Sequence, residues 1–348
     1  MATKLGYHVQ GWTPGTLETV LRANAPVLKT MAQDAEPIRA VLRARGDVQI
    51  IVRRYFDDAE QARLLQARYA GGKECAAMVA AQFRDVAKVV PKLQLWAEGL
   101  NETGLWNDAA AYNAFSVGFA EECRRQGFRP LVYSFPTGNP PGYIDGSPED
   151  LARYWAHYLD GLRAAKACDG GLALHEYSAP RMQDQETWLC LRYRRVYAVL
   201  PSDLRDLPLM ITECGIDGGV VGAPVENAGW RAFASVGEYV AQLAWYDTAI
   251  AEDEYVLGAT IFTAGNLDKW SSFDVTNVIE IAEMIAERNS VMVVGARRTW
   301  DVYDQAWSAL DEAQRAADRA QDSPLVRAIE TAKDIIRARK GELTKGRS

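Results

Sequence analysis

Eight repeats of one pattern constrain the fold of this chain more than any other feature. Each repeat is a short apolar run, a loop rich in Gly, Asn, Thr or Pro, and a longer amphipathic stretch. The first half of each run is nearly continuous in apolar residues, as expected for strands buried on both faces. Eight such units in 348 residues predict an α/β fold, a closed (β/α)8 TIM barrel. The predicted strands cover residues 5–12, 25–31, 48–56, 92–102, 129–139, 171–178, 208–217 and 256–266.

An open, doubly wound sheet is the alternative architecture. It would need a glycine-rich phosphate-binding turn after an early strand. The sequence contains neither GxGxxG nor GxxxxGK[ST], and the nearest stretch, residues 71–74 (GGKE), lacks the Ser/Thr and falls between predicted helices. The barrel is therefore favoured.

One helix start is clear, because Ser147 can cap a helix that has Pro148 at its first position and acidic residues in its first turn.

The end of the chain does not continue the pattern, so we divide the sequence into a barrel, residues 1–296, and a C-terminal helical extension, residues 297–348. This extension has no glycine between Gly295 and Gly341. It forms either a long helix that packs on the outside of the barrel or a helix that joins copies of the chain into a homo-oligomer. Small or apolar residues recur in it at spacings of about three, four and seven, at Tyr303, Trp307, Leu310, Ala317, Ile329 and Ile336.

Composition and charge exclude several classes of function. The net charge is −7 and no run of Lys or Arg forms a basic patch, so nucleic acid is not an expected partner. No apolar stretch reaches 18 residues, so no membrane association is expected. The N-terminus has no hydrophobic segment of the signal-peptide type, which predicts a protein that is cytoplasmic or released without a classical signal peptide. Five scattered cysteines without a CxxC pair give no reason to expect a metal or another cofactor.

Two glutamates at predicted strand ends suggest the chemistry. Active sites of such barrels lie at the carboxyl ends of the strands, where Glu102 ends the fourth run and Glu213 lies in the seventh. Cleavage of a glycosidic bond needs such a pair: one carboxylic acid protonates the leaving oxygen, and one carboxylate attacks the anomeric carbon or activates water. Asn101 could hold a sugar hydroxyl beside the reacting carbon, and Tyr177 could donate a hydrogen bond to Glu213.

The alternation of side chains along each strand predicts which neighbouring residues point toward the two glutamates. In the sixth run His175 and Tyr177 share one face, so Glu176 should point away from the site. Asn101 and Glu102 cannot both point inward from a regular strand, which predicts a bulge or a strand end there. His175 is either a substrate contact or a structural histidine. Further candidates for substrate contact at the strand ends are His8, Gln10, Lys29 and, after the eighth run, Trp270, which could stack on a sugar face.

These residues together resemble glycoside hydrolase clan A, whose members are retaining (β/α)8 glycosidases. The resemblance spans about residues 5–290 and rests on WAEGLNE at 96–102, ITECG at 211–215, Tyr177 and Trp270. It implies that Glu102 is the acid/base and Glu213 the nucleophile. It also implies that Asn101 binds a substrate hydroxyl, Tyr177 holds the nucleophile and Trp270 lines the cleavage subsite. Thr103 stands where a proline often follows the glutamate, and Lys29 or Arg53 is a candidate for the arginine that many members place near strand 2.

The sequence therefore predicts a retaining hydrolase of β-linked glycans with a carbohydrate substrate. Two other functions remain open. The barrel could be inactive and act as a glycan-binding or structural module of an assembly. It could instead be a metal-dependent hydrolase, but that would need a histidine pair near strand 1, where the sequence has His8-Val9-Gln10.

Overall fold

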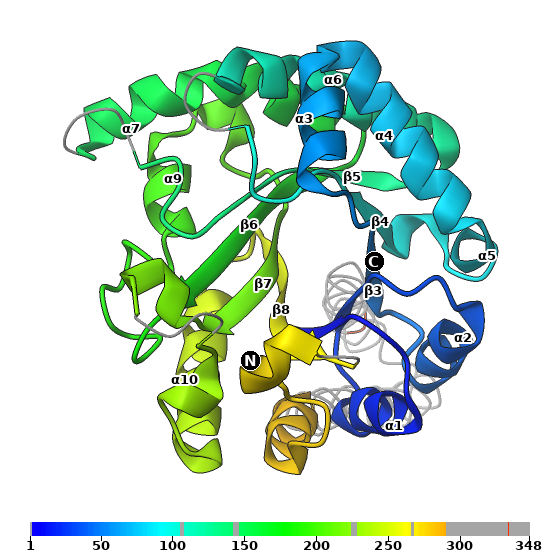
Figure 1. Cartoon of the computed structure of the whole chain (residues 1–348), viewed down its shortest axis with the longest axis vertical. Coiled ribbons are helices and arrows are strands. Elements are labelled where there is room, and N and C mark those ends of the chain that lie inside the picture. Colours follow the sequence, from blue (N-terminus) through cyan, green and yellow to red (C-terminus); the bar gives the residue numbers. More distant parts are fainter. Residues whose placement is uncertain are drawn as a thin grey trace, which may run out of the picture. The chain divides into compact units, whose positions relative to one another are not determined.

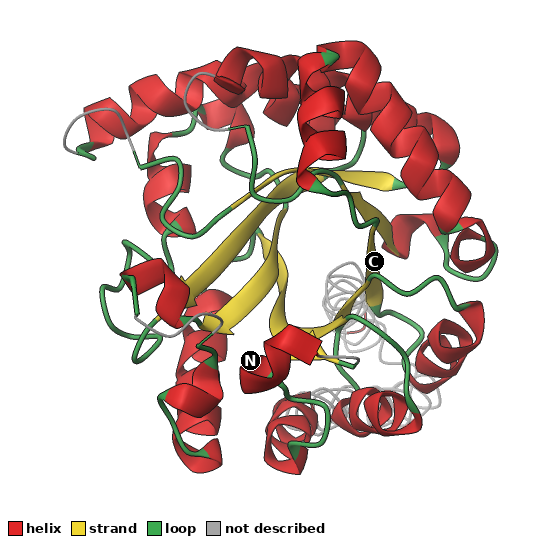
Figure 2. Cartoon of the chain, in the orientation of Figure 1, coloured by secondary structure: helices red, strands yellow, loops and turns green. Residues whose placement is uncertain are grey.

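Eight parallel strands close into a barrel in sequence order, β1 to β8, in the computed structural model (Figure 1), and helices surround them (Figure 2). The structure describes residues 2–104, 108–141, 146–223, 228–265, 268–289 and 333. The chain divides into two compact units, Met1–Arg288 and Asn289–Ser348. Apart from Lys333, the predicted C-terminal extension and its boundary at 296 lie outside the described residues.

All eight predicted strands are confirmed, although most are shorter than predicted. The barrel strands are β1 (Leu5–Val9), β2 (Val27–Thr30), β3 (Gln49–Arg53), β4 (Leu95–Glu98), β5 (Arg129–Phe135), β6 (Gly171–Ser178), β7 (Leu209–Ile216) and β8 (Val256–Ala264). The α-helices are α1 (Pro14–Ala23), α2 (Ala35–Ala44), α3 (Asp58–Gln66), α4 (Arg68–Gln82), α5 (Arg84–Ala87), α6 (Ala109–Gln126), α7 (Pro148–Trp155), α8 (Leu159–Ala167), α9 (Tyr193–Val199) and α10 (Val236–Ala251). A further helix covers 279–289.

The inside of the barrel is filled from its amino-terminal end by one apolar layer. Six of the strands each contribute one fully buried side chain to it. Such a layer makes the barrel interior a packed core rather than a pore. Because side chains alternate along a strand, the next inward-facing position lies two residues further toward the carboxyl end. The members of the layer are Val27, Ile51, Trp96, Leu131, Ala173 and Met210.

The helix start at Ser147 is confirmed, since its side chain accepts a hydrogen bond from the amide of Asp150 in the first turn of α7. The glycines of residues 71–74 were wrongly placed between helices, because they lie inside α4. A Cβ on Gly72 would come within 2.0 Å of the Phe115 carbonyl oxygen of α6, and one on Gly118 within 2.1 Å of the Tyr69 carbonyl oxygen. The glycines therefore allow two helices to pack closely, which outweighs their low helix propensity.

None of the helices in the described part of the chain has the length and apolar character that crossing a membrane requires.

Candidate active site

A charged layer lies directly above the apolar layer of the barrel. Lys29, Arg53, Glu98 and His175 each follow a member of the apolar layer by two residues on β2, β3, β4 and β6. All four side chains are buried. Buried charges are tolerated only when they are paired, and these residues supply both signs. Because side chains alternate along the strands, these four residues face the barrel interior and form the floor of the site.

Glu213 joins this layer through an irregularity in β7. The pairing of β7 with β6 shifts register at this point: Ile211 pairs with Leu174, but Glu213 pairs with His175. Thr212 is therefore an extra residue, as in a β-bulge. The bulge lets two successive side chains reach the interior, because the Thr212 hydroxyl donates to Glu98 Oε1 at 2.8 Å and Glu213 contacts Lys29.

The Glu213 carboxylate is held from both sides. Lys29 Nζ donates to Oε1 at 3.0 Å, and the Tyr177 hydroxyl donates to Oε2 at 2.9 Å. An Arg53 guanidinium nitrogen lies 3.8 Å from Oε1. Burial acts to raise the pKa of Glu213, but the positive charges of His175, Lys29 and Arg53 lower it below its usual range. Glu213 is thus ionised and fixed in orientation at neutral pH.

Glu102 lies beyond the end of its strand. Because β4 ends at Glu98, Asn101 and Glu102 belong to the following loop, which satisfies the prediction of a strand end. The Glu102 amide donates to the Ser134 carbonyl oxygen at 3.1 Å, and its φ of 49° lies in the left-handed region, which costs on the order of 1 kcal/mol. The Asn101 amide donates to Gln61 Oε1 at 2.7 Å. These contacts hold the loop on which both side chains stand.

His175 connects the two glutamates. Its Nδ1 lies 2.7 Å from Glu102 Oε1 and 3.6 Å from Glu213 Oε2, and its Nε2 lies 3.5 Å from Glu98 Oε1. Burial alone would lower the pKa of His175, but the carboxylates of Glu213, Glu102 and Glu98 outweigh burial and raise the pKa to about 9. His175 is therefore protonated at neutral pH and donates to Glu102.

Glu98 and Lys29 complete the balance of charge. Lys29 Nζ lies 2.7 Å from Glu98 Oε2, so this buried ammonium bridges two carboxylates. Burial would raise the pKa of Glu98, but Lys29 and His175 lower it well below its usual range. His8, also buried, lies 3.5 Å from Glu213 Oε1, and burial together with Lys29 lowers its pKa well below 6.5. His8 is therefore neutral.

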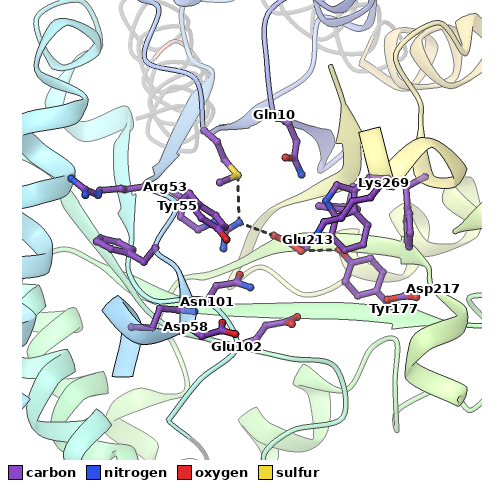
Figure 3. A pocket seen from close by; sticks show the side chains of 17 residues that line it. Gln10, Arg53, Tyr55, Asp58, Asn101, Glu102, Tyr177, Glu213, Asp217 and Lys269 are labelled. Carbon is purple, nitrogen blue, oxygen red and sulfur yellow. Dashed lines mark hydrogen bonds and ion pairs between the residues drawn. The ribbon is translucent and has the colours of Figure 1, made fainter. Parts of the chain in front are cut away.

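A cavity of about 270 Å³ opens above this floor and contains both glutamates (Figure 3). Tyr177, Phe262 and Phe273 form an aromatic wall with Trp270, whose ring lies 5.4 Å from that of Phe262. Polar and charged groups line the rest of the cavity, among them Gln10, Arg53, Arg54, Asp58, Gln61, Asn101, Asp217 and Lys269. An aromatic wall facing hydrogen-bonding groups suits a ligand with both apolar and hydroxyl-bearing faces.

The predicted site residues fall into two groups. Gln10, Asn101, Tyr177 and Trp270 line the cavity with Glu102 and Glu213. His8, Lys29 and His175 are not among its lining residues; they are buried and contact the glutamates instead.

Alternation in β6 is as predicted, because Glu176 points away from the site. It accepts hydrogen bonds from the Leu191 amide and the Tyr246 hydroxyl, at 2.8 and 2.6 Å. Trp230, which follows β7, is buried and stacked on Tyr239, with ring centroids 4.8 Å apart.

Sequence reasoning gave no role to several residues that belong to the site. Glu98 carried a usable signal, because it follows Trp96 by two residues in a buried strand and so shares its inward face. Asp58 and Gln61 follow the third strand at helical spacing, but helical spacing alone does not indicate which face meets the cavity. Lys269 and Asp217 lie on loops, for which the sequence has no periodicity to read.

Among the residues that the structure describes, one group of side chains could hold a divalent cation. Donor atoms of Glu102, His175 and Glu213 lie within 4.8 Å of one another. However, Lys29 and Arg53 lie 3.0 and 3.8 Å from Glu213 Oε1, and His175 is itself protonated at neutral pH. A metal would have to displace that proton and approach two fixed cations, so the charges favour a site that works without one.

No protein-family model and no curated protein sequence matches the chain. Among solved structures, a family 39 glycoside hydrolase from the gut symbiont Bacteroides cellulosilyticus WH2 is similar, with a TM-score of 0.51 and 11% identity over 82% of this chain and 64% of that one. A β-D-glucuronidase of Dictyoglomus thermophilum has a TM-score of 0.49 and 13% identity over 83% and 50% of the two chains.

A β-glucuronidase of Ruminococcus gnavus has a TM-score of 0.46 and 15% identity over 75% and 43% of the two chains. The chain thus spans less than two thirds of the length of these three proteins. At these identities the likeness is one of fold. The chain has the (β/α)8 barrel that is found in glycoside hydrolases.

Proposed function

We propose that this chain is a retaining glycoside hydrolase that cleaves a β-linked glycan by double displacement. One observation carries the proposal: two glutamates share one cavity in different environments. Glu213 is buried among cations, whereas the Glu102 side chain is 39% exposed and contacts one protonated histidine. Pairs of carboxyl groups in unlike environments can take the unlike roles of nucleophile and acid.

In the first step, an oxygen of Glu213 bonds to the anomeric carbon while the bond to the leaving oxygen breaks. Glu102, which takes up a proton before this step, gives that proton to the leaving oxygen. In the second step, Glu102 takes a proton from water, and the resulting hydroxide displaces Glu213 from the sugar. Lys29 and Tyr177 keep Glu213 ionised and aimed between turnovers. His175 orients Glu102 through its 2.7 Å contact.

The distance between the two carboxyl groups supports retention of configuration. One carboxylate oxygen of Glu102 lies within 4.8 Å of one of Glu213. Retaining enzymes place their carboxyl groups roughly 5–5.5 Å apart, while inverting enzymes need about 6.5–9.5 Å to admit a water molecule. The shorter range leaves no space for that water and lets Glu213 reach the sugar directly.

The stereochemistry of the first product tests this proposal. A panel of aryl β-glycosides identifies a substrate, and proton NMR then follows the anomeric configuration of the first sugar released. We expect a β product, and we expect the matching 2-fluoro glycoside to label Glu213. Glu213→Gln should lose turnover by several orders of magnitude, because an amide cannot serve as the nucleophile. An inverted first product would reject the mechanism, and binding without any turnover would favour an inactive glycan-binding barrel.

A further inference from the structure

A second cavity, of about 430 Å³, adjoins the first. The two cavities share Asp58, Gln61, Asn101 and Glu102, but Glu213 lines only the first. In the proposed reaction the sugar that reacts sits over Glu213, and the oxygen that departs receives its proton from Glu102. The departing group must therefore extend past Glu102, on the side away from Glu213. The second cavity occupies that side.

One face of α3 forms a wall of this cavity. Asp58, Gln61, Ala62 and Leu65 line it at the spacing of a single helix face, and Ala62 leaves room where a longer side chain would intrude. Thr103 and Asp108 line it as well. Figure 3 shows Asp58, Asn101 and Glu102 grouped on the opposite side of Glu213 from Gln10. The wall stands on a regular helix rather than on a loop, so its side chains have fixed spacing.

The chemistry of the lining indicates what the cavity would take. Beside Glu102, the proposed acid, its described lining residues include the carboxylates of Asp58 and Asp108 and no aromatic ring. Carboxylates accept hydrogen bonds from hydroxyl groups but repel an anion. Gln61 uses its side-chain oxygen to hold the Asn101 amide, and its amide nitrogen carries two donors. This is a surface for a hydroxyl-rich, uncharged group.

We propose that the second cavity is the leaving-group subsite and that it selects a neutral sugar over an anionic sugar. This inference rests on the proposed hydrolase activity. It predicts that substrates are glycans continuing past the cleaved bond on the Glu102 side. It assigns the choice of leaving group to the α3 face, separately from the residues that recognise the sugar over Glu213.

A matched pair of substitutions on one helix tests the inference. Ala62→Trp places a large ring in the cavity, while Ala59→Trp places the same ring at an exposed position of α3 that does not line it. Each variant is assayed with a glycosyl fluoride, whose leaving group needs no subsite, and with disaccharides of the same sugar that release glucose or glucuronic acid. The measured quantity is the ratio of kcat/KM for disaccharide to kcat/KM for fluoride.

We expect Ala62→Trp to lower the glucose-releasing ratio about tenfold or more and Ala59→Trp to leave it unchanged. Fluoride turnover reports that each variant is folded. In the unchanged protein the glucuronic-acid ratio should be about tenfold below the glucose ratio, and Asp58→Asn with Asp108→Asn should narrow this gap. A ratio unaffected by Ala62→Trp would overturn the subsite while fluoride hydrolysis still stood. Equal ratios for the two disaccharides would overturn the selection, and no turnover of any substrate would instead reject the hydrolase itself.

Discussion

His175 is the buried residue whose protonation is most strongly coupled to the carboxylates of the site. It is a buried cation that three carboxylates stabilise, and it touches both proposed catalytic groups. Its charge would be costly in the barrel interior without them. The free energy of unfolding should therefore depend on pH through the protonation of His175.

The pKa of His175 is raised from 6.5 to about 9 in the folded chain. The stabilisation from its proton is fully present below about pH 6.5, where the unfolded chain is also protonated, and is lost as pH rises through 9. We expect the free energy of unfolding to fall by about 3 kcal/mol across this range because of His175. Urea unfolding at several pH values measures it. His175→Gln should flatten the slope, while His157→Gln, at an exposed position, should not; equal slopes in both variants would contradict the assignment.

At the scale of elements, strand β6 contributes to the active site with one face and to the packing of the surrounding helices with the other. Its inward residues His175 and Tyr177 contact the glutamates, while Glu176 faces the helices. There Glu176 accepts from the amides of Leu191 and Tyr193 and from the Tyr246 hydroxyl on α10. Burial raises its pKa to about 7, against the opposing effect of these donors. One carboxyl group thus ties the start of α9 and the middle of α10 to the strand.

Removing this carboxyl should destabilise the barrel without touching the cavity. Glu176→Ala leaves three buried donors without their acceptor, at about 1–3 kcal/mol for each. We expect the free energy of unfolding to fall by about 3 kcal/mol or more in chemical denaturation at pH 7. Glu186→Ala, at an exposed position between β6 and α9, is the matched control and should change it by less than about 0.5 kcal/mol. Similar losses in the two variants would argue against this anchoring role.

At the scale of the whole molecule, the prediction concerns residues 297–348, which apart from Lys333 lie outside the described residues. Their apolar residues recur too loosely for a regular coiled-coil seam but could still form one packing face. We therefore expect deletion of 297–348 to lower the melting temperature of the protein. The oligomeric state, measured by light scattering, should stay unchanged. A fall in oligomeric mass on deletion would show instead that this segment joins copies of the chain.

Local sequence patterns specify the barrel, its eight strands and the faces of β6. These features are local: an apolar run of strand length, its terminating loop and a period of two are all written in neighbouring residues. The same signals located Glu102 and Glu213 at strand ends. They also required a break in strand geometry before Glu102, which the end of β4 at Glu98 provides.

The surroundings of the two glutamates depend instead on contacts between segments that are far apart in the sequence. Lys29 and Glu213 are 184 residues apart in the sequence, and Thr212 and Glu98 are 114 apart, yet each pair forms a hydrogen bond across the barrel. The β7 bulge that admits both Thr212 and Glu213 to the interior is visible only in the register with its neighbours. Closure of the barrel sets these contacts and the resulting pKa shifts, because burial and the distance between charges are properties of the folded chain, not of any segment of it.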